Sequence, residues 1–392
     1  MKDFKTIVEE YQKPSVKERK AALATVVRVR GSAYRSPGAR MLITDDGKWV
    51  GSISGGCLEG DALRKARKVM SEGKAMTVTY DTTEESNQHL GIGLGCNGII
   101  DVLIEPIDHA SQDNPVSIFA EFIKTDKPLA VATVFSGTDT AEKLIFNENG
   151  VAVNTFTNRA LASLVGTDLK GIFSSQRSEA KKYFAGKNYE VFLELVQPTL
   201  SLIIFGGGFD ARPVSRLAKS LGWEVSVTDE CAAHIAPLFF PTVDELALCD
   251  RKFIDRNFNI TPYTACVLMS HNYEYDRDVL RKLIHAPTPY IGILGPRKRF
   301  DKMLLEFKNE GLHPGGDMLS RVHSPIGLDI GAEAPDEIAV AIIAEVLSKV
   351  SHRSGGFLKY RQGPIHQRDG WNDQVFKQVY LGTAVAKKQN NG

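Results

Sequence analysis

The residue with the clearest chemical potential is a cysteine in a glycine-rich turn, Cys57 of the segment SGGCLEG at residues 54–60. Gly55 and Gly56 carry no side chain, so they leave the thiol and the neighbouring amide groups open to a ligand. The pattern that follows is helical, and the dipole at a helix start favours the thiolate form. Glu59, two residues further on, is in range to accept the thiol proton.

A second cysteine, Cys96, has a comparable setting in the segment GLGCNG at residues 93–98. Neither cysteine belongs to a Cys-x-x-Cys pair, so a structural zinc site is not expected. The alternative for both is burial as small hydrophobic side chains, the usual state of a free cysteine. The remaining cysteines have no partner spacing and are interpreted as core or loop thiols: Cys231, Cys249 and Cys266.

Two arginines flank a Pro-Gly turn in another glycine-containing loop, GSAYRSPGAR at residues 31–40. Arg35 and Arg40 have the chemistry of an anion clamp, because a guanidinium group binds phosphate through two parallel hydrogen bonds. Tyr34 would add a surface for stacking. The alternative is that both arginines are solvated loop charges, which is common for such residues.

A phosphate-binding pattern, GGGFDA at residues 206–211, directly follows a short apolar run. It fits G-x-G-x-x-A, in which Gly206 permits a tight turn and Gly208 lets a pyrophosphate approach the backbone. Ala211 allows close packing of helix on strand, and Gly207 completes the glycine run. The free amide groups of the following helix start would then face the phosphates.

Asp229 ends the next predicted strand, at the distance expected of the acid that binds a ribose 2′-hydroxyl. Its charge and that of Glu230 would repel a 2′-phosphate, so an NAD-like ligand is favoured over an NADP-like one. The alternative is a glycine turn in a parallel sheet that binds nothing, since this fold hosts many functions.

Two histidines lie in predicted loops of the same region. His271 lies in the segment SHNYEYD at residues 270–276, and the carboxyl ends of parallel strands are where such sheets bind ligands. His271 is therefore a candidate proton donor or ligand contact, and the alternative is a loop in which Asn272 or Asp276 caps a helix. His323 precedes a proline that stiffens its loop.

The elements that must position these residues follow two patterns. In the N-terminal part, apolar spacing predicts helices over 1–13 and 61–70, and strands over 21–29, 41–44, 48–53, 76–80 and 99–104. From residue 200, strands over 202–205, 224–227, 265–269 and 290–294 alternate with helices over 210–221, 275–285, 298–310 and 332–350. Such alternation predicts a parallel sheet.

The segment between these two regions is harder to interpret. We expect helices over 115–124, 158–165 and 176–184, and strands over 129–135, 143–147 and 189–196. The predicted class is α/β, with an α+β domain over 1–106 and an extension or connecting α/β segment over 107–199. A Rossmann-like doubly wound parallel sheet over 200–350 and a polar tail over 351–392 complete the chain.

Composition limits the functional classes further. The 392 residues have 43% hydrophobic and 24% charged residues and a formal net charge of +1. No global basic field exists for nucleic acid or an anionic membrane. An odd number of cysteines, five, does not suit a disulfide scaffold. We see no signal peptide and no apolar stretch long enough to span a membrane, so a cytoplasmic protein is expected.

Six motifs in this order resemble the XdhC/CoxI family, accessory proteins of molybdenum hydroxylases such as xanthine dehydrogenase and carbon monoxide dehydrogenase. They are GSAYRSPGARM (31–41), GSISGGCLEG (51–60), GLGCNG (93–98), GGGFDA (206–211), YIGILG (290–295) and PIGLDIGA (325–332). The resemblance covers residues 20–106 and 200–350, whereas 107–199 contain no such motif.

The resemblance implies a factor that binds the molybdenum cofactor, assists its sulfuration and hands it to a molybdenum hydroxylase. It implies that Cys57 and Cys96 belong to the cofactor site, as molybdenum or sulfur contacts, and that Arg35 and Arg40 meet the cofactor phosphate. A client hydroxylase, a cysteine desulfurase and a second copy of the chain, as a dimer, are the expected partners. The name xanthine dehydrogenase, which members often carry, would not suit a chain without the cysteines of iron–sulfur clusters.

Two other functions compete with this one. The first is an NAD-dependent oxidoreductase that acts on a small molecule and uses His271 or His323 as an acid, and the second is a regulatory nucleotide-binding module. An enzyme would turn over with NAD and a small substrate alone, whereas a carrier would retain a pterin. For a cofactor carrier, we expect the loops of Cys57 and Cys96 to converge, and to lie near the Rossmann cleft if the domains act together.

Overall fold

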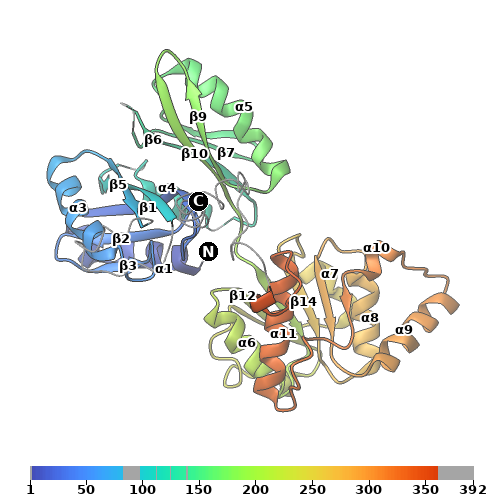
Figure 1. Cartoon of the computed structure of the whole chain (residues 1–392). Coiled ribbons are helices and arrows are strands. Elements are labelled where there is room, and N and C mark those ends of the chain that lie inside the picture. Colours follow the sequence, from blue (N-terminus) through green and yellow to red (C-terminus); the bar gives the residue numbers. More distant parts are fainter. Residues whose placement is uncertain (1, 83–97, 112, 124, 138–139, 361–392) are drawn as a thin grey trace, which may run out of the picture. The chain divides into compact units, whose positions relative to one another are not determined.

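The computed structural model describes residues 2–82, 98–111, 113–123, 125–137 and 140–360. Contacts within the chain divide it into two compact units, one of residues 3–198 and one of residues 199–360 (Figure 1). Residues 107–198 therefore pack with the N-terminal segment as an extension of the first unit. The units are described one at a time.

Within the described residues, the first unit contains two five-stranded sheets in which all neighbouring strands are antiparallel. Sheet A has the order β3-β2-β1-β5-β4, with β1 (Ala21–Gly31), β2 (Arg40–Thr44), β3 (Trp49–Gly51), β4 (Met76–Asp81) and β5 (Gly98–Ile107). Sheet B has the order β8-β7-β6-β10-β9, with β6 (Leu129–Ser136), β7 (Lys143–Asn147), β8 (Gly150–Asn154), β9 (Glu179–Phe184) and β10 (Asn188–Val196).

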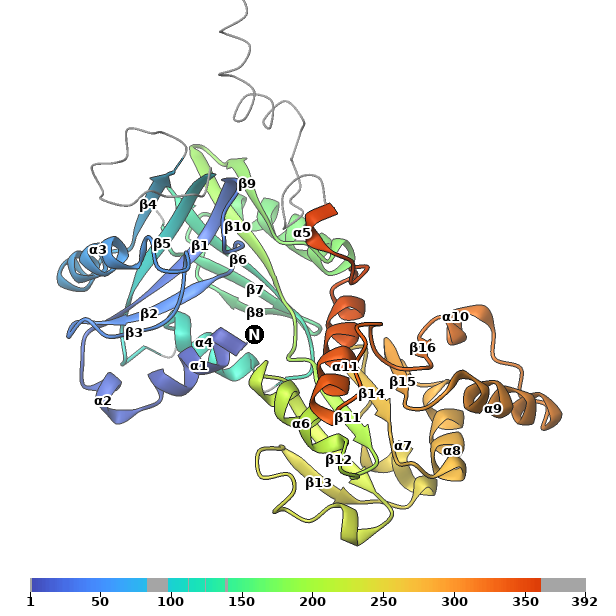
Figure 2. The same cartoon turned by 60° about the horizontal axis from the view of Figure 1, so that its bottom comes forward.

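The two sheets face each other between two helices. Helix α3 (Glu59–Glu72) packs on the outer face of sheet A and α5 (Arg159–Ser175) on the outer face of sheet B (Figures 1 and 2). Strand β1 has one face toward a helix and the other toward the second sheet. Ala22 and Ala24 pack with α3, while Val27 points the other way, toward Phe192 of β10. This alternation is the two-residue period of a strand. The short helices α1 (Lys2–Tyr11), α2 (Pro14–Lys17) and α4 (Pro115–Phe122) contribute to a further apolar cluster that contains residues of both sheets.

Buried ion pairs cross the space between the two sheets. Arg40 of β2 binds Glu194 of β10, and Lys143 of β7 binds Glu105 of β5, with all four side chains at most 9% exposed. Removal of one partner from a buried pair leaves an uncompensated charge, so each pair ties one sheet to the other.

The second unit is the parallel α/β domain that the sequence predicts. In its described residues, six parallel strands have the order β13-β12-β11-β14-β15-β16. They are β11 (Ser201–Phe205), β12 (Glu224–Asp229), β13 (Glu245–Leu248), β14 (Thr264–Leu268), β15 (Tyr290–Ile293) and β16 (Val322–His323).

Helices cover both faces of this parallel sheet. On one face lie α6 (Ala211–Ser220) and α11 (Pro335–Val350), and on the other lie α7 (Ile254–Asn257), α8 (Tyr273–Leu283) and α9 (Arg297–Asn309). The remaining short elements are α10 (Gly316–Leu319), η2 (Ala232–His234), η3 (Arg251–Phe253) and η4 (Leu358–Tyr360). The doubly wound arrangement is confirmed.

Two expectations about local structure were wrong. The helix expected over 176–184 is the strand β9, because its residues pair with β10 from Asn188↔Phe184 to Leu193↔Glu179. Strand β5 does not stop before Pro106. Its neighbour β4 pairs only as far as Ile104, so Pro106 has a partner strand on one side only, where a missing N–H is tolerated.

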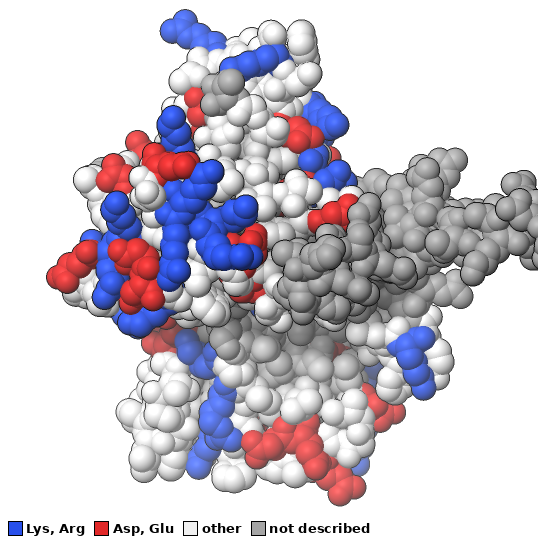
Figure 3. Space-filling view, turned by 60° about the vertical axis from the view of Figure 1, so that its left-hand side comes forward, with Lys and Arg blue, Asp and Glu red and all other residues white. Residues whose placement is uncertain are grey.

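The surface carries charges of both signs. On the face shown in Figure 3, Lys and Arg side chains gather with Asp and Glu side chains beside them. This mixture agrees with a formal net charge of +1. Among the described residues, no helix combines the length and the apolar character needed to cross a membrane.

Candidate functional site

The glycine-rich loops of the first unit converge at one end of sheet A. Gly31 pairs with Gly98, and a Cβ on Gly98 would lie 2.2 Å from the carbonyl oxygen of Ser32. A Cβ on Gly55 would lie 4.0 Å from the Cβ of Tyr34. The loop of residues 31–40 therefore contacts both the cysteine loop around Gly55 and the residue that closes the 93–98 motif. Cys96 lies outside the described residues, so the distance between the two thiols stays a prediction.

The cysteine loop is wrapped around the carboxylate of Glu59. Seven hydrogen bonds from described residues end on its two oxygens. The donors are the hydroxyls of Ser52 and Ser54 and the backbone N–H groups of Ile53, Ser54, Gly55, Gly56 and Leu58, at 2.5–3.2 Å. Gly55 and Gly56 have φ of +102° and +121°, a region that favours glycine.

This geometry gives Glu59 a role different from the proton acceptor predicted from the sequence. Its side chain is buried, and although burial raises the pKa, the hydrogen bonds from Ser54 and Ser52 outweigh that effect and lower the pKa of Glu59 to about 2. A carboxylate so acidic holds its loop rather than a proton. The amide groups of Gly55 and Gly56, which we expected to be open to a ligand, are turned to Glu59.

Cys57 stands at the turn that Glu59 organises. It is a free, partly exposed thiol, and it directly precedes Leu58, the N-cap residue of α3. It packs beside the cluster that contains Ala33 and Leu58. The cysteine is thus held in a fixed loop while part of its surface remains accessible.

Arg40 is engaged by a carboxylate and not by an open anion site. Its two terminal nitrogens bind the oxygens of Glu194 at 2.8 and 2.5 Å, and one also donates to the Gly38 carbonyl at 2.8 Å. The rings of Phe4 and Phe119 lie 5.1 and 4.6 Å from its guanidinium carbon. The guanidinium group of Arg40 is therefore already bound by a carboxylate, whereas the sequence predicted that it would be open to a phosphate.

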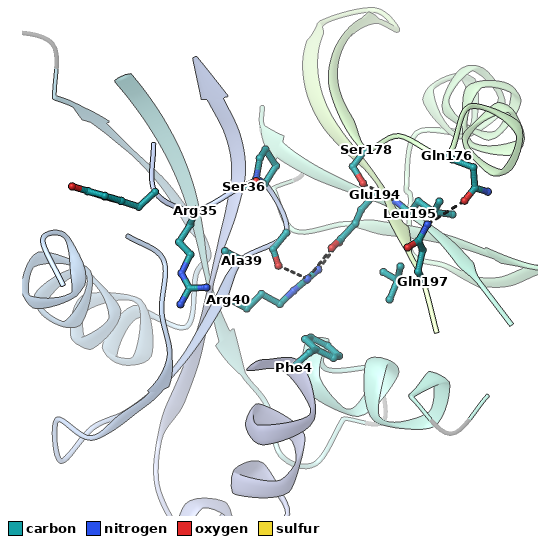
Figure 4. A pocket seen from close by; sticks show the side chains of 14 residues that line it. Phe4, Arg35, Ser36, Ala39, Arg40, Gln176, Ser178, Glu194, Leu195 and Gln197 are labelled. Carbon is teal, nitrogen blue, oxygen red and sulfur yellow. Dashed lines mark hydrogen bonds and ion pairs between the residues drawn. The ribbon is translucent and has the colours of Figure 1, made fainter. Parts of the chain in front are cut away.

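A cavity of about 560 Å³ opens beside this arginine (Figure 4). One wall is the loop from Tyr34 to Arg40, which includes the half-buried Arg35. The other wall comes from the second sheet and the end of α5, with Gln176, Ser178 and residues 194–197, and Phe4 of α1 completes the lining. Sequence reasoning missed the second wall because residues 107–199 carry no recognisable motif.

In the second unit, the glycine loop has the geometry that the fingerprint predicts. Gly206 has φ +116°, and a Cβ there would lie 2.4 Å from the backbone of Ser270. Ala211 begins α6 and is 1% exposed in the apolar cluster under that helix. In the described part of the chain, the amide N–H groups of Gly208, Phe209 and Asp210 make no hydrogen bond. Unpaired amides at a helix start are the groups that bind phosphate.

Asp229 ends its strand as expected, but its carboxylate is bonded to groups of the protein itself. Its carboxylate accepts hydrogen bonds from the N–H groups of Gly207 and Cys231, both at 2.9 Å, and lies 3.0 Å from Nδ1 of His234. The side chain is 6% exposed. It is therefore placed to hold the glycine loop, whereas the sequence predicted a contact with a ribose. Its neighbour Glu230 pairs with Arg251.

His271 lies over the glycine loop from the neighbouring strand. Its ring is 3.5 Å from the position of a Cβ on Gly208, and its Nε2 is 3.4 Å from the carboxylate of Asp210. Its backbone has φ +61°, which is uncommon for a residue with a side chain. The buried Asp276 fixes the preceding turn through a 2.6 Å bond from the Ser270 hydroxyl.

His323 is part of a network that includes a residue missed at the sequence level. Glu345 of α11 is buried, and its carboxylate accepts bonds from the Tyr290 hydroxyl at 2.6 Å and the Gly327 amide at 2.8 Å. Nδ1 of His323 lies 3.1 Å from it, and the imidazole stacks on Tyr290 with ring centres 4.7 Å apart. The sequence feature that could have identified Glu345 is its position as a single glutamate within the apolar stripe of the predicted helix.

Metal-ligating side chains do not cluster in the part of the chain that the structure describes. There, no group of three His, Cys, Asp or Glu residues is arranged so that it could hold a metal ion. The predicted contacts of Cys57 and Cys96 to molybdenum or sulfur stay predictions, because one of the two residues lies outside that part.

Comparison with known families gives two matches that follow the two units. Residues 16–81 match the XdhC and CoxI family, and residues 202–346 match the family described as the XdhC Rossmann domain.

Individual proteins extend this similarity over most of the chain. A protein of Bacillus subtilis named as a probable xanthine dehydrogenase subunit is 32% identical over 330 residues, which cover 84% of this chain and 93% of that protein. "Molybdenum cofactor insertion chaperone PaoD" of Escherichia coli is 23% identical over 351 residues, 90% of each chain. A crystal structure described as a xanthine dehydrogenase from Bacillus halodurans has a TM-score of 0.73 and 29% identity, covering 90% of this chain and 97% of that one.

Proposed function

Because the chain belongs to the XdhC and CoxI family, we propose that it binds the molybdenum cofactor, assists its sulfuration and delivers it to a molybdenum hydroxylase. The relative PaoD, which is named as a molybdenum cofactor insertion chaperone, supports the same function. The client hydroxylase and a cysteine desulfurase are the proposed partners, and a dimer of the chain is the proposed assembly.

The observation that carries this proposal is the meeting of the glycine-rich loops around Cys57. Ser32 contacts Gly98, and Tyr34 lies beside Gly55, so segments far apart in the sequence form one end of sheet A. A cargo site must hold its ligand firmly and still release it to a partner. A partly exposed thiol on a loop fixed by a buried carboxylate meets both needs.

In this proposal, Cys57 as a thiolate ligates molybdenum or carries the sulfur, since the thiolate is the form that does either. Cys96 takes part from the neighbouring loop. Glu59 keeps the cysteine turn in shape, and Arg35 stands beside the cofactor with its positive charge. Arg40 is left out of the anion site because Glu194 already occupies it.

The test is the substitution Cys57→Ser in the full chain. We expect the variant to keep its circular dichroism spectrum, to retain less molybdenum cofactor after expression, and to leave a co-expressed client hydroxylase inactive. Molybdenum is measured by mass spectrometry and the pterin by the fluorescence of its oxidised form.

The matched control is Cys231→Ser, which removes an exposed thiol from the second unit. That variant should mature the hydroxylase at the wild-type rate. Full maturation by Cys57→Ser itself would remove this thiol from the proposed mechanism.

We further propose that the glycine loop of the second unit binds a phosphate-bearing ligand, with an NAD-like dinucleotide as the candidate. The unpaired amides of Gly208, Phe209 and Asp210 fit a phosphate. The ribose half of a dinucleotide fits less well, because both oxygens of Asp229 are already engaged by the protein.

A further inference from the structure

We propose that Arg212 is a phosphate-binding residue of the glycine loop in the second unit, and that its charge makes a diphosphate the preferred group of the ligand. The inference rests on the phosphate-bearing ligand proposed above for this loop. It adds the residue that supplies the positive charge and the number of phosphates that the ligand brings. A diphosphate from either source, free or within a nucleotide, has the required chemistry.

Arg212 lies beside the amide groups that would bind a phosphate. It is the second residue of α6, and the unpaired amides of Gly208, Phe209 and Asp210 directly precede this helix. Side chains of a helix lean toward its N-terminus, so the guanidinium group extends back toward the loop. The structure agrees with this direction, since the ring centre of Phe209 lies 5.3 Å from the guanidinium carbon.

The guanidinium group is held by aromatic rings and has no acidic partner. The ring centre of Phe239 lies 3.7 Å from its carbon atom, which is the geometry of a cation–π contact. Among the described residues, Nε of Arg212 is buried without a hydrogen-bond partner, and no hydrogen bond or ion pair engages the two terminal nitrogens, which are not fully buried. The terminal N–H groups are therefore left for a ligand.

Carboxylates lie around the loop, so a bound phosphate needs a permanent positive charge nearby. Asp210 stands at the start of α6, and Asp229 ends the neighbouring strand β12. Their histidine neighbours, His271 and His234, are charged only when protonated. A guanidinium group stays charged well above neutral pH, so Arg212 offsets the repulsion between these carboxylates and a phosphate.

The two sets of donors together match a diphosphate. The amides of residues 208–210 suit the oxygens of one phosphate, and the planar fork of Arg212 suits two oxygens of a neighbouring phosphate. The amides carry no formal charge, so they offset little of the second negative charge that a diphosphate brings. We therefore expect orthophosphate to depend mainly on the amides, and pyrophosphate to need Arg212 as well.

The experiment measures binding of inorganic pyrophosphate, orthophosphate and NAD to the full chain by calorimetry. We expect the wild type to bind pyrophosphate about tenfold or more tightly than orthophosphate. Arg212→Gln should lower the affinity for pyrophosphate about tenfold and that for orthophosphate only slightly, so that the preference disappears. Tighter binding of NAD than of pyrophosphate would identify a nucleotide as the source of the diphosphate, and weaker binding would identify a free diphosphate.

The matched control is Arg216→Gln, which removes an equal charge from the same helix but from an exposed arginine that pairs with Asp336. It should bind pyrophosphate like the wild type. Arg212→Lys keeps the charge and loses the fork, so its affinity should lie between those of the wild type and Arg212→Gln. Circular dichroism checks that each variant is folded. An affinity of Arg212→Lys no higher than that of Arg212→Gln would overturn the role of the charge.

Failure of this inference is distinguishable from failure of the proposed phosphate site. If the wild type and Arg212→Gln bind pyrophosphate equally, the glycine loop keeps its ligand and Arg212 has no part in binding it. Equal affinities of the wild type for orthophosphate and pyrophosphate would overturn the preference for a diphosphate. If the wild type binds none of the three probes, the proposed phosphate site is wrong, and this inference is wrong with it.

Discussion

Glu59 shows, at the scale of single residues, how a correct position can suggest the wrong role. Its closeness to Cys57 predicted a proton acceptor, and the structure surrounds it with donors from residues 52–58. The run of serines and glycines before Glu59 was the sequence feature that could have indicated this structural role. Small residues let a backbone curl so that successive N–H groups face one anion, and here the anion is the chain's own carboxylate.

The substitution Glu59→Gln tests this account. The amide oxygen can replace one carboxylate oxygen, but the NH₂ group then faces the N–H groups of Gly56 or Leu58, which are also donors. We expect a loss of about 1.5–3 kcal/mol in the free energy of unfolding, as for a hydrogen-bonded buried charge. Chemical denaturation at pH 7 measures it. Glu72→Gln, at the exposed far end of α3, is the control and should change stability little.

The comparison of the wild type with Glu59→Gln also predicts how the free energy of unfolding depends on pH. The pKa of Glu59 is about 2 in the folded protein and near its ordinary 4.5 in the unfolded chain. A depressed pKa stabilises the fold above the unfolded value, and that contribution is lost as the pH falls from about 4.5 toward 2. The difference in unfolding free energy between wild type and Glu59→Gln should therefore be smaller at pH 3 than at pH 7. An unchanged difference would contradict the structural role of the charge.

At the scale of elements, the strands and helices that a sequence reveals best are those with an unbroken apolar period. Residues 202–205 and the helix at 332–350 were predicted because burial on the sheet or on one helix face dictates their pattern. Strand β9 was missed because its sequence, EAKKYF, is half-exposed and made mostly of residues that also suit a helix. Its pairing with β10 decides its conformation, and that contact is not visible locally.

The ion pair between β2 and β10 gives a prediction at this scale. Arg40→Met should lower the free energy of unfolding by about 3–5 kcal/mol, because it leaves Glu194 buried without a counter-charge. The double substitution Arg40→Met with Glu194→Met removes both charges and should recover most of that loss. Denaturant titration of both single variants and the double variant measures the coupling. A double variant less stable than either single one would show that these residues do not act as a pair.

At the scale of the whole molecule, the sequence predicted the parallel unit and the first loops but not the partner sheet that completes the cavity. The loops of Arg35 and Cys57 carry motifs, whereas Gln176, Ser178 and Glu194 come from a region without any. Their relation depends on the stacking of two sheets, which no local pattern encodes. The division near residue 199 was visible because the character of the strands changes there from alternating to continuously apolar.

Each unit has its own apolar clusters, so we expect residues 1–198 and 199–360 to fold when expressed separately. Thermal unfolding followed by circular dichroism should show one cooperative transition for each piece.

The second piece alone should bind NAD, measured by calorimetry. Gly208→Val should abolish that binding, because a side chain at this position fills the space in which a pyrophosphate approaches the backbone. Ser348→Ala should bind like the wild type, because among the described residues the Ser348 hydroxyl bonds only within α11.

We expect the proposed handover of a cofactor to depend on both units being on one chain, since tethering raises their effective concentration for each other. A mixture of the two pieces should therefore mature a client hydroxylase far more slowly than the intact chain, and equal rates would show that the units work independently.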